Sequence, residues 1–257
     1  MKNILLTYSI LLAFGLSSAS AELVGHFTFN EGTGTISNEG ISNMGFTVPD
    51  SWGSGNVLNS SSLNLSSAAT ADTGITATDL NFSGTGARTF VAWFKTDQTT
   101  DGAIFSYSPT GGGGPGKDSR ILVLGNGGLR YEISGGGFQV DNLDLNDGQW
   151  HQIAIVYGAD EQIGDVDYFV DGSLTTLDGT GTAMNIASSG TQAIKFGEDQ
   201  TGGRRFTGYL DQFSIYNEAL TQSQISALTV TAIPEPSSYA ILAGMLGLGY
   251  AMTRRRS

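Results

Sequence analysis

Nine short segments in which apolar side chains alternate with polar ones follow one another along the chain. Alternation with a period of two residues is the pattern of a β-strand that buries one face. Almost every break between the segments holds Gly, Asn or Asp, which favour tight turns. A series of strands without intervening helices predicts an all-β fold, an antiparallel β-sandwich. The segments are residues 23–30, 88–96, 103–107, 120–124, 129–133, 149–157, 166–171, 193–197 and 208–216.

Two local motifs add detail to this pattern. The run Gly125-Asn126-Gly127-Gly128 separates two of the segments, and glycine accepts the positive φ that a hairpin turn requires. Thr221 stands three residues before Gln224, which is the spacing of a capping box at the start of a helix. We therefore expect a hairpin turn at residues 125–128 and a single helix of note over residues 221–229.

The charge of the chain limits its partners. It carries 12 basic and 24 acidic residues, a formal charge of -12. Without Lys2, Glu235 and the three C-terminal arginines, the central part keeps 8 basic and 23 acidic residues. Such a surface repels phosphate backbones and anionic lipid, which argues against nucleic-acid binding and leaves divalent cations and neutral polymers as partners. Because there is no cysteine, disulfides, thiolate metal sites and thiol nucleophiles are excluded.

The first 21 residues have the pattern of a secretory signal peptide. Lys2 precedes an apolar run from Ile4 to Leu16, and small residues ending in Ala19-Ser20-Ala21 follow it. This order predicts cleavage between Ala21 and Glu22 and export of the rest of the chain. The alternative is a retained signal anchor, for which the apolar run is short.

Residues 233–257 form a second segment that we place outside the folded domain. It begins with Pro234-Glu235-Pro236, continues with the apolar stretch 239–252 and ends with Arg254, Arg255 and Arg256. A helix over the apolar stretch would be about 21 Å long, shorter than the roughly 30 Å of a bilayer's hydrocarbon core. The arginines would keep its end in the cytoplasm and leave the preceding domain outside.

This order of motif, helix and arginines resembles the PEP-CTERM sorting signal of Gram-negative bacteria. The resemblance implies that an exosortase is a partner, that the transient membrane helix is removed, and that the protein reaches the cell surface or extracellular matrix. It is common in bacteria that make extracellular polysaccharide. An ordinary C-terminal membrane anchor is the alternative.

The central part, residues 22–232, resembles the laminin-G-like, concanavalin A-like jelly-roll domains. The matching features are the turn Asn30-Glu31-Gly32-Thr33-Gly34 after the first strand, the strand 89–95, the segment 147–157 with its hairpin partner 168–172, and the segment 206–220. The resemblance implies one jelly-roll domain. Within it we expect Trp93 and Trp150 to fill the space between the sheets, and His151 to be a hydrogen-bonded structural residue.

Related sandwich domains often bind calcium at the termini of the fold, and the resemblance implies a structural Ca²⁺ site here. Asn30, Glu31 and Asp211 stand at corresponding places, and backbone carbonyls near Gly32 or Asn38 would complete the six to eight oxygen ligands. A hydrogen bond from Asp211 to a neighbouring loop is the competing interpretation.

The sequence offers no motif for catalysis. The Glu-x-Asp-x-x-Glu pattern of retaining sandwich glycosidases is absent, and neither histidine belongs to an evident triad. We therefore expect a non-catalytic domain that binds carbohydrate or protein. Trp52 is the candidate ligand-binding aromatic residue, unless it closes one end of the core. The alternatives are a coat or matrix component that acts by self-association and a glycan hydrolase with an unrecognised site.

Overall fold

The computed structural model describes residues 21–229, with gaps at 33–34, 41–43, 48–51, 56–60, 66–69, 83, 109–113, 115, 178–183, 189–190 and 192. The predicted signal peptide, apart from Ala21, lies outside the described residues. So does the whole sorting segment 233–257, with its Pro-Glu-Pro motif, apolar stretch and arginines. Within the described part, no helix is long and apolar enough to cross a membrane.

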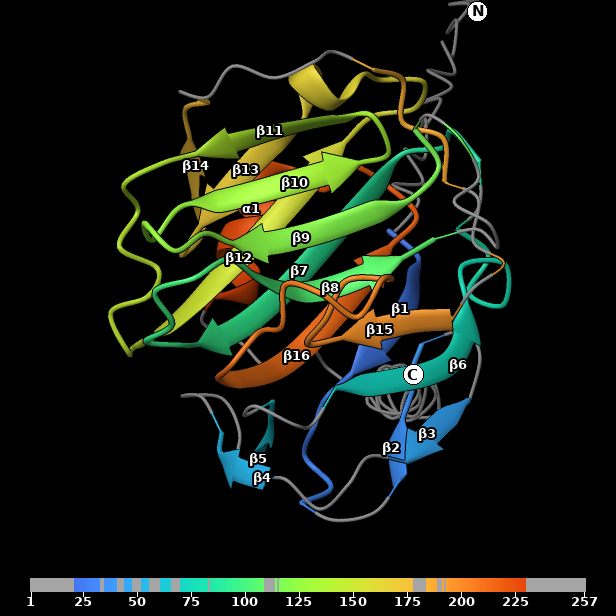
Figure 1. Ribbon diagram of the computed structural model, residues 1–257. Helices are drawn as coiled ribbons and strands as arrows, with labels where there is room; N and C mark the ends of the chain where they lie inside the picture. Colours follow the sequence, from blue (N-terminus) through green and yellow to red (C-terminus); the bar gives the residue numbers. More distant parts are fainter. Residues whose placement is uncertain are drawn as a thin grey trace, which may run out of the picture.

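The fold is a sandwich of two antiparallel sheets (Figure 1). One sheet has eight strands in the order β14-β13-β12-β7-β16-β5-β4, and β1 also pairs with β16. These strands are β1 Leu23–Phe27, β4 Trp52–Ser54, β5 Ser61–Asn64, β7 Arg88–Lys95, β12 Trp150–Tyr157, β13 Asp167–Val170, β14 Ser173–Thr175 and β16 Tyr209–Tyr216.

The second sheet has six strands in the order β11-β10-β9-β8-β15-β6. They are β6 Ala71–Thr76, β8 Gly102–Tyr107, β9 Ser119–Val123, β10 Leu129–Ile133, β11 Gly136–Val140 and β15 Ala193–Phe196. A separate small pair is formed by β2, Thr35–Ser37, and β3, Gly45–Thr47. All the pairings between strands are antiparallel, which confirms the predicted fold class.

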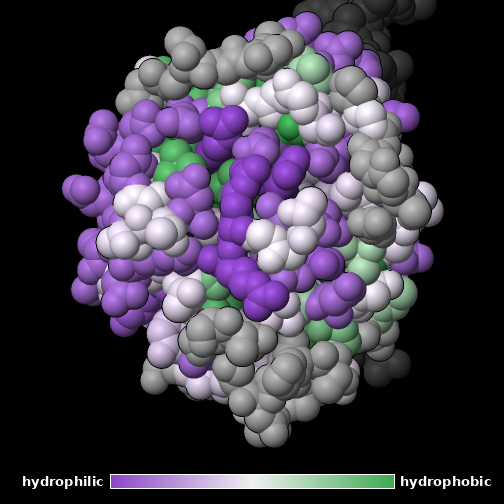
Figure 2. All heavy atoms as spheres, in the orientation of Figure 1, coloured by the Kyte–Doolittle hydropathy of each residue, from purple (hydrophilic) through white to green (hydrophobic). Residues whose placement is uncertain are grey.

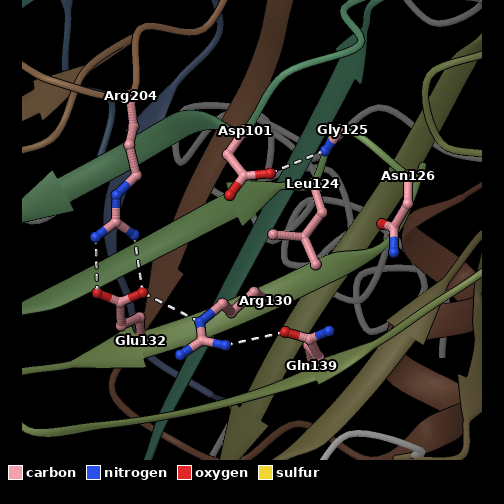
Figure 3. A pocket seen from close by; sticks show the side chains of 8 residues that line it. All are labelled: Asp101, Leu124, Gly125, Asn126, Arg130, Glu132, Gln139 and Arg204. Carbon is pink, nitrogen blue, oxygen red and sulfur yellow. Dashed lines mark hydrogen bonds and ion pairs between the residues drawn. The ribbon is translucent and has the colours of Figure 1, made fainter.

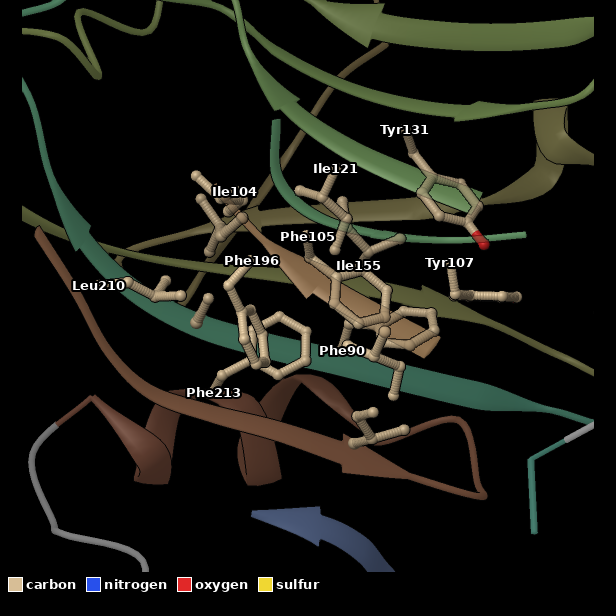
Figure 4. Close-up of a cluster of buried hydrophobic side chains, with 14 of the residues drawn as sticks. Phe90, Ile104, Phe105, Tyr107, Ile121, Tyr131, Ile155, Phe196, Leu210 and Phe213 are labelled. Atoms are coloured by element: carbon tan, nitrogen blue, oxygen red, sulfur yellow. The ribbon is translucent and has the colours of Figure 1, made fainter. Parts of the chain in front are cut away.

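The space between the two large sheets is filled by aromatic rings (Figure 4). Phe105 and Phe213 stack with ring centroids 4.6 Å apart, one from each sheet. Phe196 contacts both of these rings and also those of three further phenylalanines, Phe27, Phe29 and Phe46. Each such ring removes about 150–250 Å² from water, so this cluster accounts for much of the stability of the sandwich.

A second, smaller apolar cluster lies on the outer face of the eight-stranded sheet. Helix α1, Gln222–Leu228, covers it with Ile225. The sheet contributes five side chains, and Leu220 precedes the helix: the cluster comprises Val91, Ala154, Val156, Phe169, Tyr216, Leu220 and Ile225. The helix begins as predicted, because the Thr221 side chain accepts a hydrogen bond from the Gln224 backbone and the Gln224 side chain accepts one from the Thr221 backbone.

All nine predicted strands are present, and so is the predicted hairpin between β9 and β10. A short 3-10 helix, η2, Ile163–Asp165, lies in the connection between β12 and β13. The expectation for the two tryptophans is wrong. In β7 the side chains of Phe90, Ala92 and Phe94 face the main core, so Trp93 faces the opposite way. Trp150 is on the same outer face, because it lies two strand positions before Gln152, which pairs with Trp93.

Candidate functional site

The outer face of the six-stranded sheet carries a group of charged side chains. In β9 and β10, the buried residues Ile121 and Tyr131 alternate with Arg120, Arg130 and Glu132, which point outward. Figure 2 views the molecule from this side and shows hydrophilic residues spread over the face. Five of the eight basic residues between positions 22 and 232 lie on or beside this sheet: Arg120, Arg130, Lys195, Arg204 and Arg205.

A hollow of about 420 Å³ opens on this face over β9, β10 and β11. Figure 3 shows that its walls come from three separate parts of the chain, the start of β8, the β9–β10 hairpin with β11, and the segment before β16. The lining residues are Asp101, Leu124, Gly125, Asn126, Arg130, Glu132, Gln139 and Arg204. We call this cavity the sheet hollow.

Glu132 lies on one side of the sheet hollow and joins its arginines (Figure 3). Arg204 donates two hydrogen bonds to it, Nη1 to Oε2 at 2.8 Å and Nη2 to Oε1 at 3.1 Å. Arg130 Nε donates a third at 3.1 Å, and Arg120 Nη2 lies 3.5 Å from Oε1. Burial by itself would raise the pKa of Glu132, but the bonds and charges of these three arginines outweigh it and hold that pKa below its ordinary value.

The amide side chains of the hollow are fixed by hydrogen bonds in the same network. Gln139 accepts a bond from Arg130 Nη1 at 2.9 Å and donates one to Asp141 at 2.8 Å. Asn126 also donates to Asp141, at 3.0 Å. Because each planar group is held by a neighbour, the donors and acceptors are oriented before any ligand arrives, which reduces the entropy lost on binding.

The hairpin turn positions the wall formed by residues 125 and 126. Asn126 Oδ1 accepts a hydrogen bond from the Gly128 backbone at 3.0 Å, and Asp101 Oδ1 accepts one from the Gly125 backbone at 3.0 Å. Gly127 has a φ of 79°, a conformation that glycine adopts without steric cost. Beneath this turn, Ala103, Leu122 and Leu124 form a small apolar cluster. The hollow therefore combines polar walls with an apolar patch.

A second hollow, of about 310 Å³, lies on the same face over β6 and β15. It is lined by Asp72, Ala193, Lys195 and Gln200. Lys195 is paired with Glu198 at 3.0 Å, and Gln200 donates to the backbone carbonyls of Ser106 and Ala193 at 3.1 Å.

The structure places the predicted metal ligands in and beside strand β16 of the eight-stranded sheet, which lies between β7 and β5 and also pairs with β1. Asp211 is fully buried in β16, Asn30 is exposed, and Glu31 accepts a hydrogen bond from the Ser37 backbone at 2.9 Å. Next to Leu210, β16 pairs with Leu63 of β5 rather than with a continuation of β1. Among the residues with described positions, no three His, Cys, Asp or Glu side chains form a group that could hold a metal ion. Calcium binding therefore stays a prediction.

Trp52 lies in β4, at the edge of the eight-stranded sheet and away from the sheet hollow. It is partly buried and packs against the main core. Its Nε1 atom is buried without a hydrogen-bond partner. These contacts agree with the alternative in which it closes one end of the core, and its ligand-binding role stays a prediction.

His151 is hydrogen-bonded, as expected. Its Nδ1 lies 2.9 Å from Asp171 Oδ2, and its Nε2 lies 3.2 Å from Asp147 Oδ1. In a catalytic triad one ring nitrogen of the histidine bonds to the serine hydroxyl. Both ring nitrogens of His151 are paired with carboxylates instead, so His151 does not have the arrangement of a triad.

No motif in the sequence points to the sheet hollow. The signal was the alternation of Arg130 and Glu132 with buried residues in one strand, which is also the pattern of an ordinary solvated sheet face. Arg204 lies 72 residues from Glu132, so no local spacing could connect them.

Comparison with known proteins gives the family and the fold. Residues 69–226 match the family Laminin_G_3, described as the concanavalin A-like lectin/glucanases superfamily. One curated relative, the rat sushi, von Willebrand factor type A, EGF and pentraxin domain-containing protein 1, is 26% identical over 165 residues, which are 61% of this chain and 4% of that protein. The chain thus matches only a small part of that relative.

Solved structures of three domains have the same fold. The binding domain of Paraclostridial Mosquitocidal Protein 1 matches with a TM-score of 0.59 and 16% identity, over 81% of this chain and 52% of that one. Domain 4 of a GH43 extracellular arabinanase from Geobacillus stearothermophilus, in complex with arabinotriose, gives 0.57 and 19%, over 81% and 98%. The CBM40 of the Ruminococcus gnavus IT-sialidase, bound to α2,3-sialyllactose, gives 0.53 and 16%, over 65% and 96%.

Proposed function

The chain belongs to the concanavalin A-like lectin/glucanases superfamily, and on this premise we propose that it is a non-catalytic module that binds carbohydrate in the sheet hollow. The observation that carries the proposal is the hollow itself, where side chains from distant parts of the chain meet around Glu132 (Figure 3). Carbohydrate binding by similar domains supports it, since two of the structural neighbours contain arabinotriose and sialyllactose.

The chemistry of the lining suits a sugar. Asn126, Gln139 and Arg130 present fixed amide and guanidinium groups, which can bond to neighbouring hydroxyl groups of a sugar ring. Leu124 adds an apolar surface beside them, where the C–H face of the ring can lie. A hollow of about 420 Å³ falls in the range of small-molecule sites, whereas a stable protein partner needs about 800 Å² of surface on each side.

The electrostatics of Glu132 argue against hydrolysis at this place. A glycosidase needs a general acid whose pKa is raised. The arginines around Glu132 lower its pKa instead, so that carboxylate stays ionised near neutral pH. The domain is thus proposed to hold its ligand rather than to cleave it.

The signal peptide and sorting segment complete the proposal from the sequence. We place the mature domain outside the cytoplasm, after cleavage at Ala21 and exosortase processing at Pro234-Glu235-Pro236. Its partner there would be an extracellular polysaccharide. Mass spectrometry of the protein recovered from the producing cell tests this, because the proposal requires a chain that begins at Glu22 and lacks the final arginines. Recovery of the uncut chain would overturn it.

We also keep a structural calcium ion as a proposal. Glu31 supports it, because its Oε2 atom is buried without a hydrogen-bond partner while Oε1 is bonded to the Ser37 backbone. A carboxylate oxygen in that condition suits a cation. Calcium titration by calorimetry, with Glu31→Gln and Asp211→Asn as variants, tests the site. The absence of heat above dilution in the wild type removes the ion from the proposal.

A glycan array with matched variants tests the sheet hollow. Gln139→Ala removes an amide group from the hollow, while Gln149→Ala removes an exposed glutamine outside it. We expect binding that Gln139→Ala weakens about tenfold, the cost of about one lost hydrogen bond to a ligand, and that Gln149→Ala leaves unchanged. Equal binding by both variants, or no glycan bound by the wild type, would overturn the proposal.

A further inference from the structure

Within the described part of the chain, helix α1 covers only part of the outer face of the eight-stranded sheet. Helix α1 packs on the side chains that include Val91 and Ala154. Two residues further along these strands, the same face carries Trp93 and Gln152, which are paired across β7 and β12. Two residues further again, it carries Lys95 and Trp150, which are also paired. All four side chains point to the same side of the sheet.

At the end of the sheet, three partly exposed side chains lie in a row. Lys95 of β7 is paired with Trp150 of β12 on one side and with Tyr209 of β16 on the other. The two aromatic rings lean together, with centroids 6.4 Å apart and planes inclined by 52°. We call Trp150, Lys95 and Tyr209 the rim platform.

The edge strand beside the rim platform is shaped to hold the Tyr209 ring. Gly53 of β4 lies against it, and a Cβ atom at that position would come within 2.2 Å of Tyr209 Cε1. Any larger residue at position 53 would therefore displace the ring. The ring is thus held by contacts from both sides, Gly53 and Trp150.

The platform also carries a charged group. Lys95 forms no ion pair with any carboxylate whose position is described. Trp93 and Gln152, next to it on the same face, are buried, so Trp93 Nε1 and Gln152 Oε1, which make no hydrogen bond, are out of reach of a ligand. Lys95 is therefore the polar group that the platform itself offers to a ligand.

We propose that the rim platform is a second carbohydrate-binding site, for a neutral sugar ring that stacks on Trp150 and Tyr209. Aromatic faces attract the polarised C–H groups of a sugar, and the Lys95 ammonium donates to its hydroxyl and ring oxygens. The ligand is neutral because the domain carries 23 acidic and 8 basic residues, which repel a polyanion before one lysine can hold it. Two rings are too small an area for a protein interface.

The site lies on the opposite side of the sandwich from the sheet hollow, because each occupies the outer face of a different sheet. A domain that binds sugar on both faces links two polysaccharide strands. The cross-linking rests on the proposed function of the sheet hollow. Sugar binding at the rim platform is independent of it.

Tryptophan fluorescence of the full chain tests the platform, with soluble mixed-linkage β-glucan and polygalacturonate as probes. Trp150 is one of three tryptophans, so a ligand that stacks on it changes the emission. We expect saturable binding of the β-glucan, weakened about tenfold or more by Tyr209→Ala, which keeps Trp150 as the reporter. Tyr209→Phe keeps both the ring and the reporter and should retain most of the binding, which separates the loss of stacking from a failure to fold.

Arg204→Ala, which removes a lining residue of the sheet hollow and none of the rim platform, provides the control. It should leave the fluorescence response intact and abolish β-glucan cross-linking, measured as viscosity. A response that Tyr209→Ala leaves unchanged, or stronger binding of polygalacturonate than of β-glucan, would overturn the proposal. So would greater exposure of Trp150 after removal of the residues beyond 229, which would mean that the chain's own C-terminal segment occupies the platform. Loss of the response in Arg204→Ala alone would overturn the independence of the two sites.

Discussion

Arg204 and Glu132 form a two-bond ion pair between the segment before β16 and strand β10, with distances of 2.8 and 3.1 Å. The pair closes one side of the sheet hollow (Figure 3). It joins residues that are 72 positions apart in the sequence. The two residues differ in the number of their ion pairs. Glu132 pairs with three arginines, whereas Arg204 pairs mainly with one carboxylate.

This difference predicts that replacing the two side chains by alanine lowers the free energy of unfolding by unequal amounts. Arg204 is about one third exposed, so Arg204→Ala should lower the free energy of unfolding by about 1 kcal/mol. Glu132→Ala should lower it by about 2 kcal/mol, because it leaves Arg120, Arg130 and Arg204 facing one another without their shared carboxylate. Urea denaturation measures both. A smaller loss for Glu132→Ala than for Arg204→Ala would show that the glutamate does not organise the network.

The aromatic core makes a second prediction about stability. Phe196 is fully buried and contacts five other phenylalanine rings. Phe196→Ala should therefore cost about 4 kcal/mol, from lost burial and the cavity left behind. Leu174→Ala is the matched control, since Leu174 is 55% exposed, and it should change the stability by less than about 0.5 kcal/mol. Similar melting temperatures for the two variants would contradict this account of the core.

The sequence predicts the strands that have large apolar residues at alternate positions. It does not predict β6, because the inward positions of that strand hold Ala71, Thr73 and Ile75, of which only one is large and apolar. It does not predict β11, because that strand begins with two glycines. Small or flexible residues pair in a sheet when a neighbouring strand supplies the packing, and that neighbour cannot be read from the segment itself.

The predicted orientation of Trp93 and Trp150 is wrong for a related reason. β7 is buried on both faces, because the main core covers Phe90 and Phe94 while α1 and its neighbours cover Val91. When a strand is apolar on both faces, its sequence does not show whether the odd-numbered or the even-numbered residues face the larger core. The sheet hollow could not be predicted from the sequence for another reason. Arg204 and Glu132 are distant in the sequence, and only the order of the strands in the sheet brings them together.

Buried His26 predicts a loss of stability in mild acid. Desolvation lowers its pKa from 6.5 to about 4, so the unfolded chain binds a proton more readily than the folded one. The resulting stability is present above the unfolded pKa of 6.5 and is lost as the pH falls toward 4, up to about 3 kcal/mol. Denaturation of wild type and His26→Gln across this range gives the difference. Parallel pH profiles for the two proteins would contradict a neutral, buried His26.

His151 predicts the opposite dependence at higher pH. Its hydrogen bond to Asp171 raises its pKa above 6.5, burial opposes this, and the bond to Asp147 adds to it. The folded chain therefore holds the proton more tightly than the unfolded one, and this contribution to stability is complete below pH 6.5. It is lost as the pH rises through the folded pKa. Histidine NMR titration should give a value above that of a free imidazole for His151, and Asp171→Asn should lower it. In Asp171→Asn, the stability should also decline less between neutral and alkaline pH than in the wild type. If that variant left the titration of His151 unchanged, the ion pair at 2.9 Å would not be the source of the shift.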